Sequence, residues 1–599
     1  MSGKKNDSSL KKVVFLPEKK EVWVLKGTSI LEAALKAGIP INSPCGGKGI
    51  CGKCRVKISP LPSPSPSEVK ILGKDINEGW RLACQHYISQ DSFIEIPSSS
   101  RFYEQVILKE LKLKRVKLNP GVKKFKVSLP ERLEGTSSLT ERLPFPFSSS
   151  NYPFLKTFAK RAEKSKDFSI VFHADGRLSF MNSKHFLGLA LDIGTTTVVG
   201  YLVDLETAKI LSVSAITNPQ VIYGQDVVSR LQYALEKDKG TEILQKEIIE
   251  GVNSLIKTLL KETKAKKNDI WEVTVCGNTV MMHLFLGLKP YLLSKAPFVS
   301  LWRGALNISP SKLGLDINKE GNVYILPVIA SFVGSDTSAV IISTGIHLAS
   351  GVKMAVDIGT NGEIILCKNG EITVTSTAAG PAFEGARISQ GMRAEKGAID
   401  KVKIDETGIH IGVIGNVSPK GICGTGLVDA VAELLKIGVI AHNGYLKKSD
   451  QLQNFITPLV KERLKNSVFY LTPEVKITQR DIRELQVAKA AIRAGMKVLL
   501  RSKGLKEEDV DELYIAGGFG SYLSKESAVK IGLIPPLEGD KIKVVGNAAG
   551  AGSYLVLINK KLREKLEKII DRVEFLELAH RKEFQEEFAE QMLFPEWKD

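Results

Sequence analysis

The sequence predicts a multidomain chain of α/β and α+β units, and three observations support this prediction. The chain has 599 residues, enough for about three or four domains of ordinary size. Four of its seven cysteines fall in the first hundred residues, among short strands and one helix. A motif of strand, aspartate, glycine and threonine occurs twice, with an offset of 165 residues between Asp192 and Asp357.

The composition is that of an ordinary globular protein, with 43% apolar and 25% charged residues. No run of about 18 uncharged apolar residues is present, and the N-terminus lacks the apolar core of a signal peptide. We therefore expect a cytoplasmic protein without membrane contact. The 84 Lys and Arg residues exceed the 66 Asp and Glu residues, but the lysines are scattered and no aromatic and basic recognition motif accompanies them. We expect no nucleic acid partner, and the basic surface is compatible with an acidic protein partner.

Residues 10–97 have the order of elements expected of a β-grasp domain. A capping box at Ser29 and Glu32 predicts a helix, and Gly38 ends its apolar periodicity. A cysteine loop follows this helix. Strands or extended segments are expected on both sides, at residues 13–16, 21–25, 55–58, 80–85 and 93–96.

Four cysteines in this domain have the spacing C-x5-C-x2-C, followed after 29 intervening residues by the fourth cysteine. Four thiolates satisfy the ligand count of a 2Fe-2S cluster. The glycines between them let backbone N–H groups approach the sulfurs, which would tune the reduction potential. We therefore predict a 2Fe-2S cluster with the ligands Cys45, Cys51, Cys54 and Cys84.

Three other interpretations of this loop are weaker. A thioredoxin-like pair at Cys51 and Cys54 would need a surrounding βαβ unit and would leave the other cysteines unused. Zinc sites normally use two C-x2-C pairs, whereas Cys84 stands alone. The strings G-x-x-x-x-G-K and G-x-G-x-x-G begin at Gly47, but no Ser or Thr follows the lysine and a helix precedes the loop, so neither predicts a nucleotide site. The three later cysteines have no spacing partner and are expected to be buried small residues: Cys276, Cys367 and Cys423.

These cysteines, with Arg81-Leu-Ala-Cys84-Gln85 around the last one, resemble those of the 2Fe-2S ferredoxins. Within that family, C-x5-C is the adrenodoxin-like and bacterial variant of the loop. The resemblance implies one-electron transfer, at a reduction potential that can lie near the low end of the biological range.

Two short regions follow the predicted ferredoxin domain. We expect a linker at residues 98–121, because a Pro/Ser stretch opens it and Pro120-Gly121 ends it. Residues 122–186 are expected to form a small α+β middle domain. No chemistry is predicted there, and its expected role is spacing or docking.

From residue 187 onward, the chain carries the repeated motif of strand, aspartate, glycine and threonine. Each copy brings an aspartate, Asp192 or Asp357, into a Gly/Thr turn between two strands. Such turns offer backbone N–H groups and hydroxyls to an anion, and the aspartate at the strand end is placed to hold a divalent cation. If a pseudo-twofold axis relates the copies, both turns face one cleft. An anion with its cation would then offset the repulsion of the two aspartates.

Later in the chain, residues 513–520 and 544–550 are buried strands that end in glycine turns, where a flat ring can lie against the backbone. Together with the two hairpins, they resemble the acetate kinase, sugar kinase, Hsp70 and actin superfamily of ATPases over residues 187–599. The resemblance implies a duplicated ribonuclease H-like (actin-like) domain with halves at about residues 187–350 and 351–599. It also implies ATP with Mg²⁺, bound by Asp192, Gly194, Thr195, Thr196, Gly359, Thr360, Asn361, Gly517 and Gly518.

The candidate catalytic residues are three carboxylates, Asp192, Asp357 and Glu363. The string Asn361-Gly-Glu363 departs from the Thr/Gly-rich form usual in sugar kinases. Either Asp357 or Glu363 is therefore expected to position the water for ATP hydrolysis.

The combination of a 2Fe-2S ferredoxin with such an ATPase resembles the reductive activators of corrinoid proteins, over essentially the whole chain. Three further strings are family-like: residues 223–230, 276–283 and 424–426. The resemblance implies that one electron passes from the cluster to a corrinoid protein and returns inactive Co(II) to Co(I). An energetically uphill electron transfer of a few hundred millivolts needs an external source, because each tenfold change in equilibrium corresponds to about 59 mV. ATP hydrolysis would be that source.

The partners implied are a corrinoid methyl-transfer protein and an unidentified low-potential electron donor, and any homodimer is expected to form through the ATPase domain. Two other functions stay open. One is ATP-dependent reduction of another low-potential protein centre, although known activators of that kind carry no separate ferredoxin. The other is a small-molecule kinase with a redox-sensing ferredoxin domain. His283 follows two methionines in an apolar run, and we interpret it as a core residue rather than a cobalt ligand.

Overall fold

A computed structural model describes most of the chain. Cys45 and most of the predicted linker lie outside the described part. The described residues are 10–17, 19–39, 41, 43, 47, 49–97, 100, 116–129, 151–385, 387–452, 458–465 and 467–596. None of the helices formed by these residues is long and apolar enough to cross a membrane.

The N-terminal domain is a five-stranded sheet packed against a short helix, α1, which confirms the β-grasp prediction. Its strand order is β2-β1-β5-β3-β4, with β1 antiparallel to β2 and parallel to β5. The predicted capping box closes α1, since Ser29 Oγ and Glu32 Oε2 each accept a backbone N–H at 3.1 and 3.2 Å. The elements are β1 (Leu10–Leu16), β2 (Lys20–Leu25), α1 (Ile30–Lys36), β3 (Arg55–Ser59), α2 (Pro66–Leu72), β4 (Trp80–Leu82) and β5 (Ser92–Glu95).

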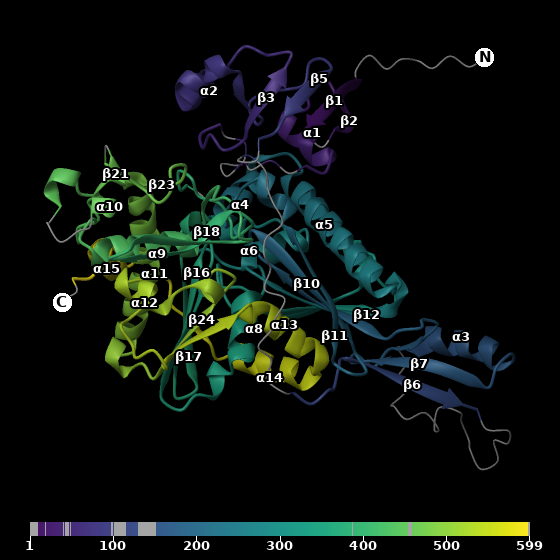
Figure 1. Cartoon of the computed structure of the whole chain (residues 1–599). Helices are drawn as coiled ribbons and strands as arrows, with labels where there is room; N and C mark the ends of the chain where they lie inside the picture. Colours follow the sequence, from purple (N-terminus) through teal and green to yellow (C-terminus); the bar gives the residue numbers. More distant parts are fainter. Residues whose placement is uncertain are drawn as a thin grey trace, which may run out of the picture.

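A small unit of three antiparallel strands and one helix projects from the side of the molecule (Figure 1). Its own core consists of four phenylalanine rings whose centroids lie 4.7 to 6.0 Å apart, a spacing typical of favourable aromatic pairs: Phe154, Phe158, Phe168 and Phe180. The elements are β6 (Val122–Ser128), α3 (Tyr152–Ala162), β7 (Asp167–His173) and β8 (Leu178–Phe180).

The rest of the chain contains two six-stranded sheets with the same plan. In each sheet three antiparallel strands are followed by two parallel ones: β11-β10-β9-β12-β14 in the first and β17-β16-β15-β24-β25 in the second. The sixth strand differs between the sheets, since β13 pairs with β14 in the first and β26 pairs with β17 in the second. The repeated motif predicted from the sequence is therefore a repeated fold. The first sheet comprises β9 (Leu187–Ile193), β10 (Thr197–Asp204), β11 (Ile210–Thr217), β12 (Ile270–Gly277), β13 (Gly304–Ile308) and β14 (Asn322–Val328). The second comprises β15 (Val352–Ile358), β16 (Gly362–Lys368), β17 (Glu371–Thr377), β24 (Glu512–Ala516), β25 (Ile542–Gly546) and β26 (Glu574–Phe575).

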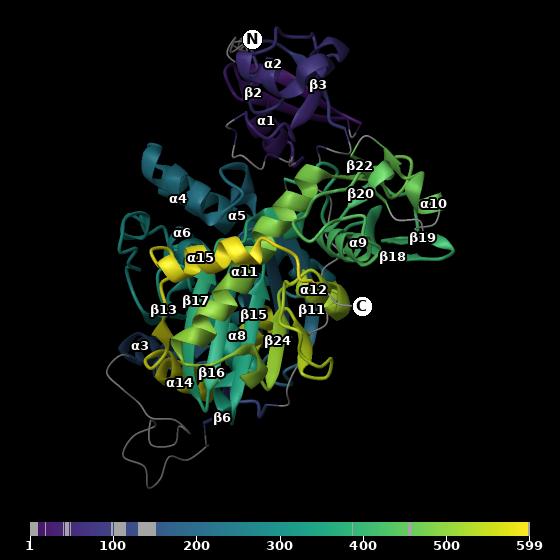
Figure 2. The same cartoon turned by 90° about the vertical axis from the view of Figure 1, so that its left-hand side faces the viewer.

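Helices cover the outer face of each sheet. In the first half, α5 packs against β10 and β11. In the second half the equally long α11 packs against β16 and β17 (Figure 2). The helices of the first half are α4 (Val227–Glu236), α5 (Gly240–Thr263), α6 (Thr279–Phe285) and α7 (Pro310–Leu313). Those of the second are α9 (Gly424–Lys436), α10 (Pro458–Lys461), α11 (Gln479–Ser502), α12 (Lys525–Lys530) and α15 (Lys582–Gln591). Two small sheets accompany them: β18 (Ala398–Asp405) with β19 (Gly408–Val413) and β20 (Gly421–Ile422), and β21 (Leu464–Lys465) with β22 (Val468–Tyr470) and β23 (Lys476–Thr478).

Two helices lie between the sheets and join the halves. These are α8 (Ser335–Thr344) and α13 (Ala548–Ile558), which pack against each other within one apolar cluster. Although α13 comes near the end of the chain, it packs on β9 and β12 of the first half. Its junction with α14 (Lys560–Ile570) also binds the segment before β6, because Asn119 exchanges two backbone hydrogen bonds of 2.8 Å with Ile558 and Lys560.

A buried ion pair fastens α14 to the first sheet. Arg563 Nη1 lies 2.7 Å from Glu272 Oε1 on β12, and both side chains are almost fully buried. We expect Glu272→Gln to destabilise the protein by about 3 to 5 kcal/mol, because it leaves a buried guanidinium without its counter-charge. Scanning calorimetry would show this as a lower denaturation midpoint. Glu586→Gln, which breaks the exposed pair with Lys582, should change the midpoint little. Equal midpoints for the two variants would contradict the prediction.

Candidate functional site

The two hairpin turns of the repeated motif line a single cavity of about 490 Å³ between the halves. The structure thus brings together residues that lie more than 300 positions apart in the sequence. All the residues predicted to bind the nucleotide line it: Asp192, Gly194, Thr195, Thr196, Gly359, Thr360, Asn361, Gly517 and Gly518. The other two predicted catalytic residues, Asp357 and Glu363, line it as well. Their individual roles stay predictions.

The first turn is held from behind by two polar side chains. Asn218 Nδ2 donates to the carbonyl of Gly194 at 2.8 Å, and the Arg230 guanidinium donates to the carbonyl of Thr195. Arg230 comes from α4, inside one of the strings that we described as family-like, and burial lowers its pKa to about 9. The charged side chain therefore acts within the protein core, where it fixes the direction of the turn.

One detail of the turns differs from expectation. The N–H of Gly194 donates to Thr197 O at 2.9 Å, and the N–H of Gly359 donates to Asn361 O at 3.0 Å. These two N–H groups close the hairpins, as expected for tight two-strand turns, and are not available to an anion. The donors that remain in the turns for a phosphate include the threonine hydroxyls.

The second turn meets the first glycine of the later Gly-Gly turn. Gly517 has φ +93°, and a Cβ added there would lie 2.5 Å from Asp357 Oδ1. Only glycine permits this approach. On the neighbouring strand, Glu363 is the direct cross-strand partner of Asp357, so both carboxylates face the cavity. In the first half, Val199 occupies the position that corresponds to Glu363.

Burial raises the pKa of the three predicted catalytic carboxyl groups in this cavity, Asp192, Asp357 and Glu363. The pKa of Asp192 is raised to about 7 by burial, although an Asn547 hydrogen bond opposes the shift. Burial and the nearby Asp336 raise the pKa of Asp357 to about 7, and the pKa of Glu363 is raised well above its usual value. Carboxylates gathered in this way favour a cation, and hard oxygen ligands suit Mg²⁺.

The residues described here do not form a metal site alone, since no three His, Cys, Asp or Glu side chains among them are grouped closely enough. A magnesium ion in this cavity would share its ligands with phosphate oxygens and water, as is usual in nucleotide sites. The donor set therefore fits a magnesium nucleotide, with the Asp192 and Asp357 carboxylates beside the two turns as candidate ligands.

Two polar residues of the cavity were missed in the sequence. Asn547 is the N-cap of α13, and its Nδ2 donates to Asp192 Oδ2 at 3.0 Å. Asp336 lies at the start of α8, which occupies the equivalent place after β14, and burial raises its pKa to about 6. For Asn547 the signal that could have found it is its place directly after Gly546, the glycine that ends the parallel strand β25. Asp336 lies well past the end of β14, and no such pattern marks it.

A third residue, Glu384, was also missed and joins the two turns. Its Oε2 accepts the Thr196 hydroxyl at 2.7 Å, and its Oε1 accepts the Thr360 hydroxyl at 2.5 Å. No periodicity or turn motif marks Glu384 in the sequence. The Glu384 carboxylate thus bridges the cleft between the two halves, because it binds a threonine from each.

Two of the predicted cluster ligands lie side by side in the N-terminal domain. Cys54 Sγ lies 3.4 Å from Cys84 Sγ, and the backbones around them pair, with the Ala83 N–H donating to Cys54 O at 2.8 Å. Cys51 lies on the same loop as Cys54, whereas the predicted ligand Cys45 lies outside the described residues. The described thiols fit the cysteine ligands of a 2Fe-2S cluster.

Two neighbouring side chains hold Cys84 in place. Gln85 Nε2 donates to Gly47 O at 2.9 Å and lies 3.6 Å from Cys84 Sγ. The buried Glu68 accepts the N–H of Leu82 at 2.6 Å and contacts His86 Nε2 at 2.7 Å, so it anchors the chain on both sides of Cys84. Burial would raise the pKa of Glu68, but these donors bring it down to about 2, and the carboxylate is therefore ionised at neutral pH.

The remaining sequence interpretations concern core residues. His283 is buried, with Nδ1 2.8 Å from Thr279 O and Nε2 accepting the N–H of Leu301 at 3.3 Å. This confirms that it is a core residue. The three later cysteines are buried as expected: Cys276, Cys367 and Cys423.

Three family models match the chain. One described as the 2Fe-2S iron-sulfur cluster binding domain matches residues 14–89. One described as the RACo middle region matches residues 187–349, and one described as the C-terminal domain of RACo, the ASKHA domain, matches residues 351–599.

Similar proteins agree with these matches. The corrinoid activation enzyme RamQ of Eubacterium limosum is 33% identical over 574 residues, which cover 92% of this chain and 93% of that protein. A Co(II) methylated amine-specific corrinoid protein reductase of Methanosarcina barkeri is 28% identical over 412 residues, 63% of this chain and 72% of that protein. Among solved structures, a reductive activator for corrinoid, iron-sulfur protein has a TM-score of 0.71 at 33% identity and covers 98% of each chain.

Proposed function

Because this chain belongs to the family of reductive activators of corrinoid proteins, we propose that it uses ATP hydrolysis to transfer one electron to a corrinoid protein and converts its Co(II) to Co(I). One observation carries the proposal. A single chain places the two Gly/Thr turns of the repeated motif around one cavity and sets the cysteine loop of a ferredoxin domain beside that cavity.

The residues of the cavity divide the work on the nucleotide. The hydroxyls of Thr195, Thr196 and Thr360 face the place for the phosphates, and Asp192 is held there by Asn547. A bound magnesium ion supplies positive charge to the phosphate oxygens. Gly517, Gly518 and Phe519, which line the same cavity, would hold the purine.

Asp357 and Glu363 are placed to orient the attacking water. They lie opposite each other on β15 and β16, and both face the cavity. A carboxylate that orients water accelerates phosphoryl transfer by positioning rather than by covalent chemistry. The raised pKa of each carboxyl group fits a site in which a bound cation offsets the negative charge.

The N-terminal domain supplies the electron. We assign Cys45, Cys51, Cys54 and Cys84 as cluster ligands, with Gln85 and Glu68 fixing the position of Cys84. A 2Fe-2S cluster carries one electron at a time. An external low-potential donor reduces the domain before each transfer, and the hydrolysis of ATP makes the step to Co(I) favourable.

The test compares Co(I) formation with and without ATP. The holoprotein, reduced and mixed with a Co(II) corrinoid protein, should give the absorption of Co(I) only when Mg-ATP is present, and phosphate release should increase with the corrinoid protein. Reduction that is equal without ATP would overturn the proposal. Transfer of phosphate to a metabolite, without need of a protein partner, would identify a small-molecule kinase instead.

A further inference from the structure

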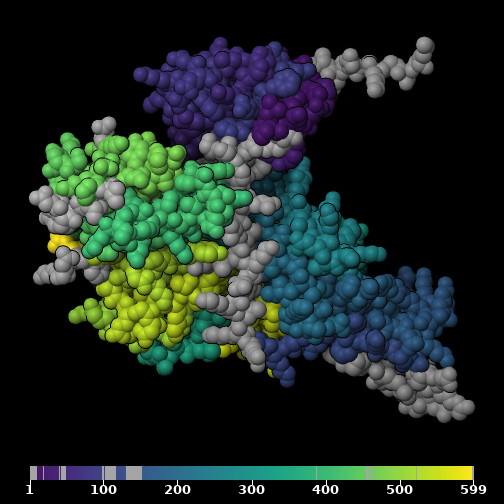
Figure 3. All heavy atoms as spheres, viewed as in Figure 1, coloured from purple at the N-terminus to yellow at the C-terminus, as the bar shows by residue number. Residues whose placement is uncertain are grey.

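The cysteine loop makes a specific contact with the second half of the ATPase domain. Lys53, which lies between Gly52 and the ligand Cys54, donates from Nζ to Ile388 O at 2.8 Å and to Ser389 O at 3.3 Å. In the space-filling view the N-terminal domain stands above the two halves of the ATPase domain (Figure 3).

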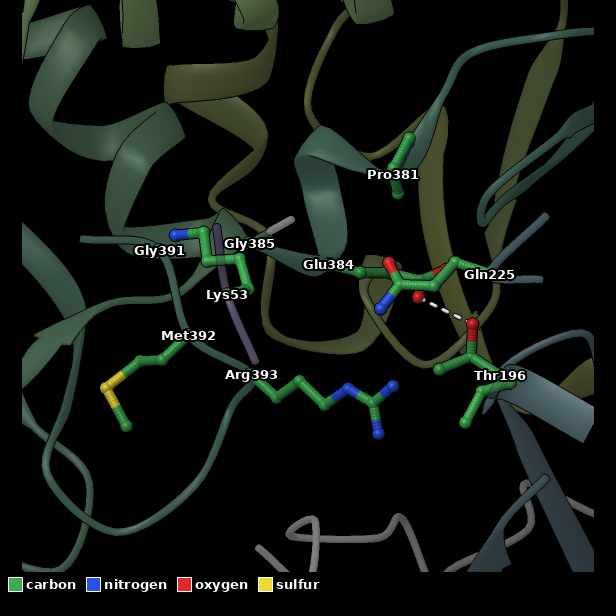
Figure 4. A pocket seen from close by; sticks show the side chains of 10 residues that line it. Lys53, Thr196, Gln225, Pro381, Glu384, Gly385, Gly391, Met392 and Arg393 are labelled. Carbon is green, nitrogen blue, oxygen red and sulfur yellow. Dashed lines mark hydrogen bonds between the residues drawn. The ribbon is translucent and has the colours of Figure 1, made fainter. Parts of the chain in front are cut away.

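The Lys53 side chain enters a small crevice that adjoins the nucleotide cavity (Figure 4). Three residues line both spaces: Thr196, Glu384 and Arg393. Burial lowers the pKa of Lys53, while the nearby Asp481 carboxylate opposes that change. The ammonium is therefore partly removed from water and depends on the two carbonyls as acceptors.

One segment carries both these carbonyls and the carboxylate that spans the cleft. We define it as residues 381–385 and 387–393, and call it the bridging segment. At one end, Glu384 accepts the hydroxyls of Thr196 and Thr360. At the other, Ser389 is fixed to the N-terminus of α11, since Asp481 accepts its N–H and its hydroxyl at 2.6 Å each.

We propose that the bridging segment couples the nucleotide site to the cysteine loop, with Glu384 as the sensor of phosphate and Lys53 as the residue that positions the ferredoxin domain. Without nucleotide, Glu384 holds the threonines of both turns, and the segment presents its carbonyls to Lys53. With nucleotide, phosphate oxygens take the threonine hydroxyls and the Lys53 contact is released.

Charge gives the direction of this coupling. The Glu384 carboxylate and the phosphates of ATP are both anions that use the same two hydroxyls, so they compete for them. A ligand that binds one of two states better shifts the equilibrium toward that state. Nucleotide binding therefore favours the state in which Glu384 has left the turns and the segment has moved.

Release would have a role in electron transfer. In the docked state Lys53 ties the loop that carries Cys51 and Cys54 to the ATPase domain, which restricts how a protein partner can approach this edge. A released ferredoxin domain can present the same edge to the corrinoid protein. The inference rests on the nucleotide-binding part of the proposed function and adds the element that transmits it.

The test measures the nucleotide affinity of the full-length holoprotein. Coupling is reciprocal: if nucleotide binding weakens docking of the ferredoxin domain, docking weakens nucleotide binding by the same factor. Lys53→Met should tighten the binding of a non-hydrolysable ATP analogue by about 5-fold or more, the lower range of typical coupling. Lys53→Arg keeps a cation that can donate to both carbonyls and should restore the wild-type value. Lys74→Met, at an exposed lysine of the same domain, is the matched control and should change nothing.

A double-mutant cycle separates coupling from a local charge effect. Glu384→Gln should also tighten nucleotide binding, in part because it removes a negative charge near the phosphates. If the bridging segment couples the sites, Lys53→Met adds little in the Glu384→Gln background. Additive effects, or a Lys53→Met affinity equal to that of the wild type, would overturn the inference. A wild-type protein that binds no nucleotide would instead overturn the proposed function, so the two failures are distinguishable.

Discussion

Asp192→Asn should lower ATP-dependent Co(I) formation by about 10²- to 10³-fold, because it removes several kcal/mol of charge interaction with the magnesium nucleotide. Asparagine has the shape of aspartate and can still contact Asn547, so the turn should keep its structure. The loss is expected in phosphate release and in Co(I) absorbance alike. The visible spectrum of the cluster should be unchanged, because Asp192 belongs to the ATPase domain.

A matched control separates this effect from a general loss of charge. Asp540 is an exposed aspartate of the same domain, and Asp540→Asn should keep full activity. A fully active Asp192→Asn protein with an intact cluster would show that the cavity is not the site that powers reduction.

Cys84→Ala should abolish the visible absorption of the cluster and, with it, Co(II) reduction at any ATP concentration. The reason is the ligand count: with Cys84 replaced, Cys54 loses the sulfur that lies 3.4 Å from it, and three thiolates cannot complete the site. Nucleotide binding should be retained, since the cavity is built from residues 192 onward. Absorption spectroscopy checks the loss of the cluster, and titration with an ATP analogue checks that nucleotide binding is retained.

The control for this variant is Cys367→Ala. Cys367 is fully buried in β16 of the ATPase domain, so the substitution is equally internal but remote from the loop. Its cluster spectrum should equal that of the wild type. A wild-type spectrum in Cys84→Ala would mean that the cluster uses other ligands.

The parts of the fold that were predicted from the sequence depend on local patterns. The capping box at Ser29, the alternation of the hairpin strands and the cysteine spacing are all encoded within a few tens of residues. The two halves were predicted because Asp192 and Asp357 lie in turns of the same composition. Because the motif occurs twice, it supports the prediction of two related halves more strongly than a single copy would.

The missed residues share a different property. Asn547, Asp336 and Glu384 reach the cavity through long-range packing. Asn547 lies in the predicted glycine turn at residues 544–550, but nothing in that turn assigns it a role, and no local pattern marks Asp336 or Glu384. Lys53 appeared in the sequence as the lysine of a phosphate-loop string that was correctly dismissed, because its neighbours have the wrong secondary structure. Its contact with Ile388 joins residues 335 positions apart, and no local pattern predicts such a pair.

The position of α13 has a consequence for how the protein can be made. This helix covers β9 and β12 but is synthesised long after them, so the first half stays incomplete until α13 has been translated. Contacts between such distant segments are slow to form, and the uncovered apolar strands are prone to aggregate meanwhile. A fragment that ends near residue 350 should therefore be insoluble when expressed alone. Co-expression with the missing C-terminal part should restore its solubility.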